Sequence, residues 1–322
     1  MQRRQLVRAA GAALALPALA RAQAYPSRPI RYIVPVPAGG GNDMIARVVT
    51  ERWSRLLGQP FVVDNQGGGS GVVACQTTAR AAPDGYTLLQ AYVATHGTNP
   101  ATRRVPYDPV KDFTPIGMVG ASPNVLVVHA GVPARSLQEF IDLARRSGGK
   151  LSYGSAGLGT LTHLTMELFK HDTGTSLLHV PYRGAAPAIA DVLSGQTQAM
   201  FPSVATALPH VRSGKLRALA VTGKRRSGQL PDVPTMEEAG FKGFDAVQWY
   251  CTLGPAGMPR EIVQRLHATQ VAVLGAPDLA DKLASEAVDP WPMSPEQLGD
   301  HIRSEVARWT ALASARNIKL EE

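Results

Sequence analysis

The sequence predicts two α/β domains, each built from a sheet with helices on its faces. Short β-type runs alternate with helical patterns along most of the chain, an order that produces parallel sheets covered by helices. With 322 residues, the chain has room for about two domains of roughly 150 residues each. Two extended segments, 123–133 and 248–255, break the alternation and are expected to cross between the domains. Two crossings make the first domain discontinuous, with boundaries at 25–124 plus 247–322, and leave 125–246 as the second domain beyond a hinge.

The first block of elements runs from residue 30 to the first crossing segment. Asp43 is a good N-cap for the first helix, whose apolar residues share one face until Gly58 ends it. Tyr107 begins a connection that is punctuated by prolines. The expected elements are, in order, a strand at 30–34, a helix from 43 to 57, a strand at 61–63, a helix from the glycine loop at 67–71 to about 81, a turn at 83–85, and strands at 86–91 and 125–129.

The second block repeats this scheme. Ser136 and Glu139 have the spacing of a capping box, and Gly148 and Gly149 end the helix that the box opens. Pro187 suits the first turn of a later helix. The expected elements are then a strand at 151–153, a helix at 160–173, a strand at 177–180, a helix at 187–195, a strand at 197–201, a helix at 204–213, a strand at 216–221, and a mostly helical segment after 259 with a break at 291–295.

The first 24 residues have the three regions of an export signal. Arg3, Arg4 and Arg8 precede an apolar stretch at 9–20, and Ala22-Gln23-Ala24 is a small-x-small cleavage site. The apolar stretch is shorter than the roughly 20 residues that a membrane-spanning helix needs. We expect a periplasmic protein cleaved near Ala24, exported by the secretory or by the twin-arginine route.

Charge and cysteine content argue against several classes of protein. The signal carries four arginines and no acidic residue, so its removal lowers the formal net charge from +8 to +4. The remaining cations are scattered, and the pair at 103–104 and the cluster at 224–226 are interpreted as solvated loop charges, so no nucleic-acid partner is expected. Cys75 and Cys251 lack neighbours at ligand spacing. Two buried free thiols are expected, and a single bridge between them remains open.

Three glycine loops, at 39–41, 67–71 and 154–160, each follow a strand and precede a helix. The first turn of a helix has N–H groups without internal acceptors and the positive end of the helix dipole, so it attracts anions. One such loop is usually a tight turn, but three in matching places indicate an anion site. A dinucleotide fingerprint is weak here, because no acidic residue ends the next strand.

The sequence offers no catalytic or metal-binding constellation. His96, His129, His163 and His179 are separated and lie in or near apolar stretches, so they are interpreted as hydrogen-bonded structural histidines. No GxSxG elbow, no GxxxxGK[ST] loop and no general acid and base pair is present. We therefore expect no catalytic residue, no metal and no cofactor, and a secreted enzyme is the least favoured alternative.

Several stretches resemble, in order, the solute-binding proteins of tripartite tricarboxylate transporters, also called Bug proteins. The resemblance covers nearly the whole mature chain. It rests on PAGGGNDMIAR, VVDNQGGGSGVVA, AAPDGYTLL, PYDPVKDFTPI, SYGSAGLGTLTHLTMELF, HVPYRGAAPAIADVLSG and GKLRALAVTGKRR.

The resemblance implies a type II periplasmic-binding-protein fold, in which two α/β domains joined by two crossing strands close on a small carboxylate. It also implies delivery to inner-membrane permease subunits rather than chemistry. A signalling role with the periplasmic domain of a sensor kinase is the alternative, and the identity of the carboxylate is left open. The ligand contacts that it implies are Pro37, Ala38, Gly39, Gly40, Asn42, Asp43, Gly69, Ser70, Gly71, Thr95, Ser155, Ala156, Gly157, Gly159, Thr160, Tyr182 and Arg183.

Two positions depart from the family's usual wording. Asn42 stands where threonine is more common, and Pro202 occupies a usually acidic position. Among the implied contact loops, Arg183 is the one residue with a guanidinium group, so the first-domain loops must offer an anion main-chain N–H groups, the helix dipole and bound water.

Overall fold

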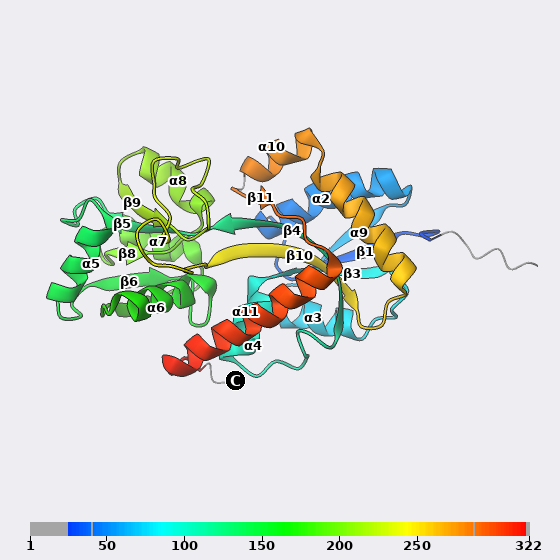
Figure 1. The fold of residues 1–322 in the computed structure, drawn as a ribbon, viewed down its shortest axis with the longest axis horizontal. Helices are drawn as coiled ribbons and strands as arrows, with labels where there is room; N and C mark the ends of the chain where they lie inside the picture. The colour runs from blue at the N-terminus through cyan, green and yellow to red at the C-terminus, as the bar shows by residue number, and fades with distance from the viewer. Residues whose placement is uncertain (1–24, 40, 286, 320–322) are drawn as a thin grey trace, which may run out of the picture.

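The protein forms two lobes joined by long strands (Figure 1). The computed structural model describes residues 25–39, 41–285 and 287–319. The expected export signal at 1–24 and the expected ligand contact Gly40 lie outside the described residues. Throughout the described ranges, every helix is too short or too polar to cross a membrane.

The first domain is built on a six-stranded sheet in the order β11-β4-β10-β3-β1-β2. Strands β1, β2 and β3 are parallel, as expected, but β10 lies antiparallel between β3 and β4. The sheet is therefore mixed, because the chain returns from the second domain and inserts β10 in the opposite direction. The elements are β1 (Ile30–Val34), α2 (Gly41–Leu57), β2 (Phe61–Asn65), η1 (Gly69–Gly71), α3 (Val72–Ala79), β3 (Thr87–Tyr92), η2 (Ala94–Thr98), α4 (Asn99–Thr102), β4 (Phe113–Pro123), β10 (Val247–Pro255), α9 (Arg260–Leu274), α10 (Pro277–Ser285), β11 (Asp289–Pro290) and α11 (Pro295–Ala315).

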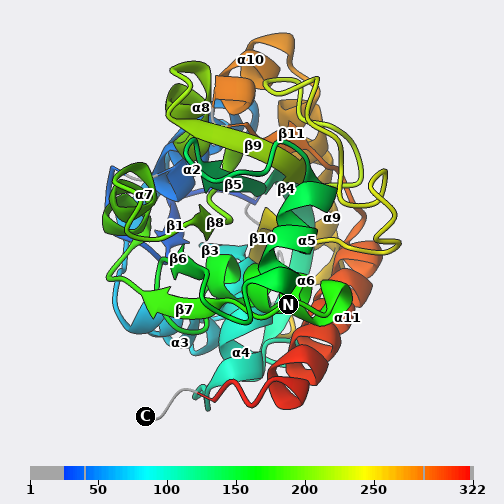
Figure 2. The same cartoon turned by 90° about the vertical axis from the view of Figure 1, so that its left-hand side faces the viewer.

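The second domain has a five-stranded sheet in the order β7-β6-β8-β5-β9. Strand β6 is parallel to β7 and β8, whereas β5 is antiparallel to β8 and β9. Figure 2 views the molecule from the side of this domain. Its elements are β5 (Val125–His129), α5 (Leu137–Arg146), β6 (Ser152–Ser155), α6 (Leu161–Thr173), β7 (Leu178–Pro181), α7 (Ala185–Leu193), β8 (Ala199–Met200), α8 (Val204–Arg212) and β9 (Leu216–Val221).

A single buried threonine ties the two crossings together. Asn124 is the one residue between β4 and β5, and Thr222 directly follows β9. The Thr222 hydroxyl accepts the Asn124 N–H at 2.9 Å and donates to the Ala246 carbonyl at 2.8 Å. The Thr222 N–H donates to the Asn124 carbonyl at 2.9 Å. The outgoing and returning chains are therefore hydrogen-bonded to each other where they pass between the sheets.

Helix α11 connects the domains a third time, along one side of the molecule (Figures 1 and 2). Its N-terminal part packs on β4 of the first domain, and its last turns reach α6 of the second domain. There the Arg316 Nε donates to the buried Glu167 carboxylate at 3.0 Å, beside bonds from Tyr153 OH and Lys170 Nζ. Burial would raise the pKa of Glu167, but these hydrogen bonds outweigh burial and lower it. Ile318, which follows Arg316 closely, is also buried in the hydrophobic core.

A cavity of about 210 Å³ lies on one face of the crossing strands. Pro123 and Val247 line it from the strands, and Lys224, Asp245 and Trp291 line it from neighbouring segments. We call it the back cavity.

Replacing Thr222 by valine keeps the shape of the side chain and removes its hydroxyl. Because a buried N–H and a buried carbonyl then lose their partner, we expect the free energy of unfolding to fall by about 1 to 3 kcal/mol in urea denaturation. Thr269→Val is the matched control, since its hydroxyl lies on an exposed helix face and bonds the carbonyl one turn back. It should change stability by less than about 0.5 kcal/mol. Equal losses in both variants would contradict the role given to Thr222.

Candidate ligand site

A second cavity, of about 310 Å³, lies between the two domains. Its wall contains hydroxyl and carboxamide side chains, and within the described chain Arg103 is the one charged residue among them. The first domain contributes Ser70, Tyr92, Ala94, Thr98, Asn99 and Arg103, the crossing strands Asn124 and Gln248, and the second domain Ala156, Gly159, Thr160, Leu161, Thr162, Ala185, Ser203 and Thr206. We call it the interdomain cavity.

The crossing strands separate the two cavities. Asn124 and Gln248 line the interdomain cavity, while their neighbours Pro123 and Val247 line the back cavity. Successive side chains of an extended strand point to opposite faces, which accounts for this alternation.

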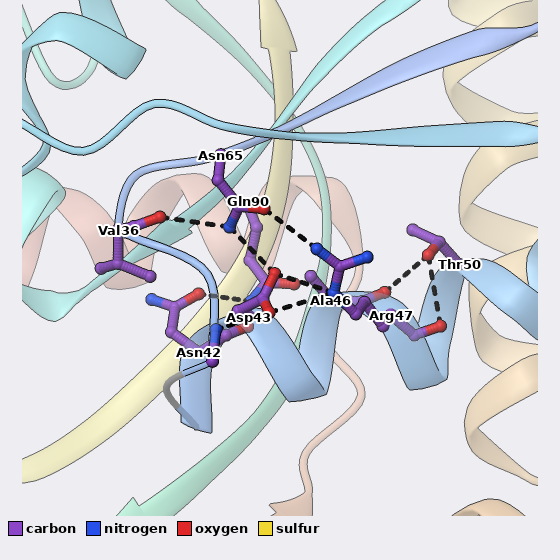
Figure 3. A network of polar contacts seen from close by, with 9 residues as sticks. Val36, Asn42, Asp43, Ala46, Arg47, Thr50, Asn65 and Gln90 are labelled. Atoms are coloured by element: carbon purple, nitrogen blue, oxygen red, sulfur yellow. Dashed lines mark hydrogen bonds and ion pairs between the residues drawn. The ribbon is translucent and has the colours of Figure 1, made fainter.

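Asp43 organises the first glycine loop, and it does so from inside the helix. Helix α2 begins at Gly41, so the expectation that Asp43 is its N-cap is wrong. The carboxylate accepts the Gly39 N–H at 2.9 Å, the Asn65 Nδ2 at 2.9 Å and the Arg47 Nε at 3.0 Å (Figure 3). Burial would raise the pKa of Asp43, but these bonds lower it. This carboxylate is therefore already hydrogen-bonded by the loop, by β2 and by the next turn of α2.

Asn42 is also held by protein groups. Its main-chain carbonyl and its Oδ1 accept hydrogen bonds from the buried Gln90 Nε2, at 2.6 Å and 2.5 Å (Figure 3). Pro37, Ala38 and Gly39 are exposed and lie outside the cavity wall.

The second glycine loop reaches the cavity through Ser70. This residue has a left-handed conformation with φ 58°, and its carbonyl accepts the Asn99 Nδ2 at 2.9 Å. Gly71 has φ 92°, and a Cβ there would lie 2.7 Å from the Thr95 Cγ2, so glycine is needed for close packing. Thr95 itself is fully buried and bonds the Tyr92 main chain, and its neighbours Ala94 and Thr98 line the cavity in its place.

The third glycine loop uses most of its N–H groups internally. Those of Ala156, Gly157, Gly159 and Thr160 donate to the Thr162 Oγ1, the Ser155 Oγ, the His163 Nδ1 and the Gly157 carbonyl. Most main-chain N–H groups of this loop are therefore already bonded to protein acceptors and are not free to bind an anion. The first-turn N–H groups of α6 have no helical acceptors, and Leu161 and Thr162 of that turn line the cavity.

A stack of three side-chain rings lies against this loop. His163 and His179 lie with ring centroids 4.1 Å apart, and Tyr153 stacks on His179 at 4.8 Å. The Ser155 Oγ lies 2.6 Å from the His179 Nε2. The sequence treats these histidines as separate structural residues. The structure stacks them on each other and bonds both to the third glycine loop, outside the cavity wall. Burial is the main cause that lowers the pKa of each to about 4, and the neighbouring His163 contributes to the lowering for His179.

Tyr182 and Arg183 lie beside the third loop and outside the cavity wall. The Tyr182 N–H donates to the Ser155 carbonyl at 3.0 Å, and its hydroxyl donates to Asp191 at 2.5 Å. Arg183 is exposed. Of the expected contacts, the structure brings Ser70, Ala156, Gly159 and Thr160 together at the wall.

Sequence reasoning missed most of the wall. Arg103 is half-buried and lines the cavity, so its interpretation as a solvated loop charge is wrong, whereas the adjacent Arg104 is exposed. Asn124 and Gln248 stand in the predicted crossing segments, which is the sequence signal that could have indicated them. Pro202 is buried, and the next residue, Ser203, lines the cavity without bringing a carboxylate to it.

Two further sequence questions concern metals and thiols. Among the residues that the structure describes, no three His, Cys, Asp or Glu side chains meet in an arrangement suited to a metal ion. Cys75 and Cys251 are both buried free thiols, so no disulfide joins them. Burial raises the pKa of both thiols.

Solved structures with the same architecture define the class of protein. R. palustris Rpa4515 with adipate superposes with a TM-score of 0.79 at 36% identity, covering 92% of this chain and 99% of that one. MatC (Rpa3494) from Rhodopseudomonas palustris with bound malate gives 0.74 at 30% identity, covering 89% and 99%. The fold and the cavity thus define a two-domain periplasmic solute-binding protein of type II, a receptor and not an enzyme.

The family follows from the sequence. Residues 45–318 match the model of the tripartite tricarboxylate transporter family receptor, TctC. Protein BugT of Bordetella pertussis is 35% identical over 303 residues, which cover 93% of each chain. This chain belongs to the TctC family, the periplasmic receptors of tripartite tricarboxylate transporters.

The histidine stack predicts a specific pH dependence of stability. An unfolded histidine titrates near 6.5, whereas the folded His163 titrates at about 4, so the unfolded chain binds more protons between these values. The free energy of unfolding should therefore fall as pH decreases from 6.5 to about 4. The charge of Glu167 raises the pKa of His163 and so limits this fall, whereas the charge of Lys170 lowers that pKa. His163→Phe should give a shallower pH dependence in urea denaturation.

His210→Asn is the control for this experiment, because His210 takes no part in the stack. Its stability curve should run parallel to that of the wild type across the same pH range. A His163→Phe curve that is also parallel would mean that protonation of this ring does not destabilise the fold.

Proposed function

We propose that this chain captures a small carboxylate in the interdomain cavity and delivers it to the membrane subunits of a tripartite tricarboxylate-type transporter. The observation that carries the proposal is the composition of the wall, which combines neutral hydrogen-bonding groups with Arg103 and, in the described chain, has no carboxylate. Such a wall favours anions over cations. Adipate and malate in the structures of two relatives support the same ligand class.

The carboxylate would meet the second domain at the start of α6. The first-turn N–H groups of this helix and its dipole favour negative charge there. Ser70 would face the ligand from the first domain, and waters would extend the reach of its glycine loops.

The proposal includes export with cleavage near Ala24. The order of charged, apolar and small residues in the first 24 residues supports it, and so does the periplasmic location of the family.

Titration calorimetry tests the ligand class. The mature protein, residues 25–322, should bind adipate, malate or a related carboxylate, and should not bind the corresponding amides, because the cavity wall selects negative charge. Mass spectrometry of the denatured protein shows beforehand whether a solute was purified with it. A ligand-free protein that gives no heat with any carboxylate, or one that converts a carboxylate chemically, would overturn the proposal.

A further inference from the structure

Helix α11 is fixed to the first domain at its middle. The buried Glu305 carboxylate of α11 accepts the indole N–H of Trp249, in the returning strand β10, at 2.8 Å. Arg308, one turn further on, donates to the Asp245 carbonyl just before β10. The sheet of the first domain therefore sets the direction of this helix. Its C-terminal end, at Arg316, lies about 16 Å beyond Glu305 along the helix axis.

Glu167 of the second domain meets this end of α11. It lies in α6 with 6% of its surface exposed, and its carboxylate accepts the Arg316 Nε at 3.0 Å. The Arg316 side chain is 29% exposed, so water screens this ion pair only in part. Within the second domain, the Lys170 Nζ and the Tyr153 OH donate to the same carboxylate at 2.6 and 2.7 Å. The Glu167 carboxylate thus joins α6, β6 and the end of α11.

Two chains of contacts lead from this carboxylate to the third glycine loop. The Tyr153 ring stacks on His179, whose Nε2 lies 2.6 Å from the Ser155 Oγ. In α6, one turn before the carboxylate, the His163 Nδ1 accepts the Gly159 N–H at 3.1 Å. Because an α-helix is a stiff unit, a displacement of α6 also moves its first turn, which lines the interdomain cavity.

The ion pair between Arg316 and Glu167 exists only in a narrow range of domain arrangements. Helix α11 packs on β4, η2 and α4 of the first domain, whereas α6 belongs to the second domain. The Nε–carboxylate distance is 3.0 Å, and a hydrogen bond is lost when its atoms move apart by less than about 1 Å. In the arrangement that contains the pair, both domains line the interdomain cavity. The pair therefore favours the arrangement in which the two walls face each other.

We propose that Arg316 and Glu167 are positioning residues of this receptor: their ion pair across the domain interface holds α6 and the third glycine loop in the cavity wall, although neither residue lines the cavity. The pair and a solute bound in the cavity then favour the same domain arrangement, so each strengthens the other by linkage. The effect on affinity rests on the proposed function, whereas the effect on the domain arrangement does not.

Arg316→Ala removes the pair and leaves the second domain intact, because Lys170 still bonds the Glu167 carboxylate. Spin labels at Leu56→Cys in α2 and Leu178→Cys in β7, both at exposed positions, report the distance between the domains by double electron–electron resonance. Both native thiols are buried and are not labelled. In protein freed of solute, Arg316→Ala should broaden the distance distribution, and Arg316→Lys, which keeps the charge, should broaden it less. A distribution identical to that of the wild type overturns the proposal.

A second measurement uses adipate as the probe of affinity. By calorimetry, Arg316→Ala should bind adipate about 5- to 10-fold more weakly, in the lower part of the range for coupled sites because water partly screens the pair. In a Glu167→Gln background the same substitution should have a smaller effect, because the two residues act through one contact. Unchanged or tighter binding by Arg316→Ala overturns the linkage. A wild type that binds no carboxylate refutes the proposed function instead, and the distance measurement then decides the positioning role alone.

Arg303→Ala is the matched control, because Arg303 lies on the same helix and pairs with Asp300 within α11. It should leave both the distance distribution and the adipate affinity unchanged, and circular dichroism should show that all variants are folded. An equal effect of Arg303→Ala would mean that the ion pairs of α11 act through the stability of the helix, and would overturn the role given to Arg316 and Glu167.

Discussion

The hydrogen bonds of Thr222 set the geometry on which the rest of the molecule depends. They join the outgoing chain at Asn124 to the returning chain at Ala246, in the fully buried space between the two sheets. Because both strands are extended there, their side chains alternate between two faces. One residue of each strand therefore reaches the interdomain cavity and its neighbour reaches the back cavity. The position of the hydrogen bonds between the two crossing chains therefore shapes the ligand site, together with the loops around it.

Local signals in the sequence predicted local structure well. Gly58 ends α2 with φ 70°, and the Ser136 side chain accepts the Glu139 N–H at the start of α5. Contacts between distant segments could not be read in this way. Nothing near residues 247–255 indicates that β10 inserts between β3 and β4, and nothing near Arg103 indicates a cavity, because its opposite wall comes from residues more than fifty positions further along the chain.

The glycine loops illustrate the same limit. Their sequence pattern suggested main chain left bare for a ligand, but many of their N–H groups bond within the loops, as Gly39 does with Asp43 and Gly159 with His163. Several of these glycines have positive φ values, and Gly71 packs too closely on Thr95 for any side chain. The glycines therefore allow closely packed, internally bonded loops, and the groups that these loops bring to the cavity are hydroxyls and a helix N-terminus.

The wall of the interdomain cavity also has constant charge over a wide range of acidity. A guanidinium does not titrate in proteins, burial raises the pKa of Tyr92, and the histidine stack behind the third loop stays neutral above about 4. Near neutral pH the charge of the cavity wall thus stays the same. We therefore expect a change of affinity with pH in that range to follow the ionisation of the bound solute, so that binding measured against pH would give the pKa of an unidentified ligand.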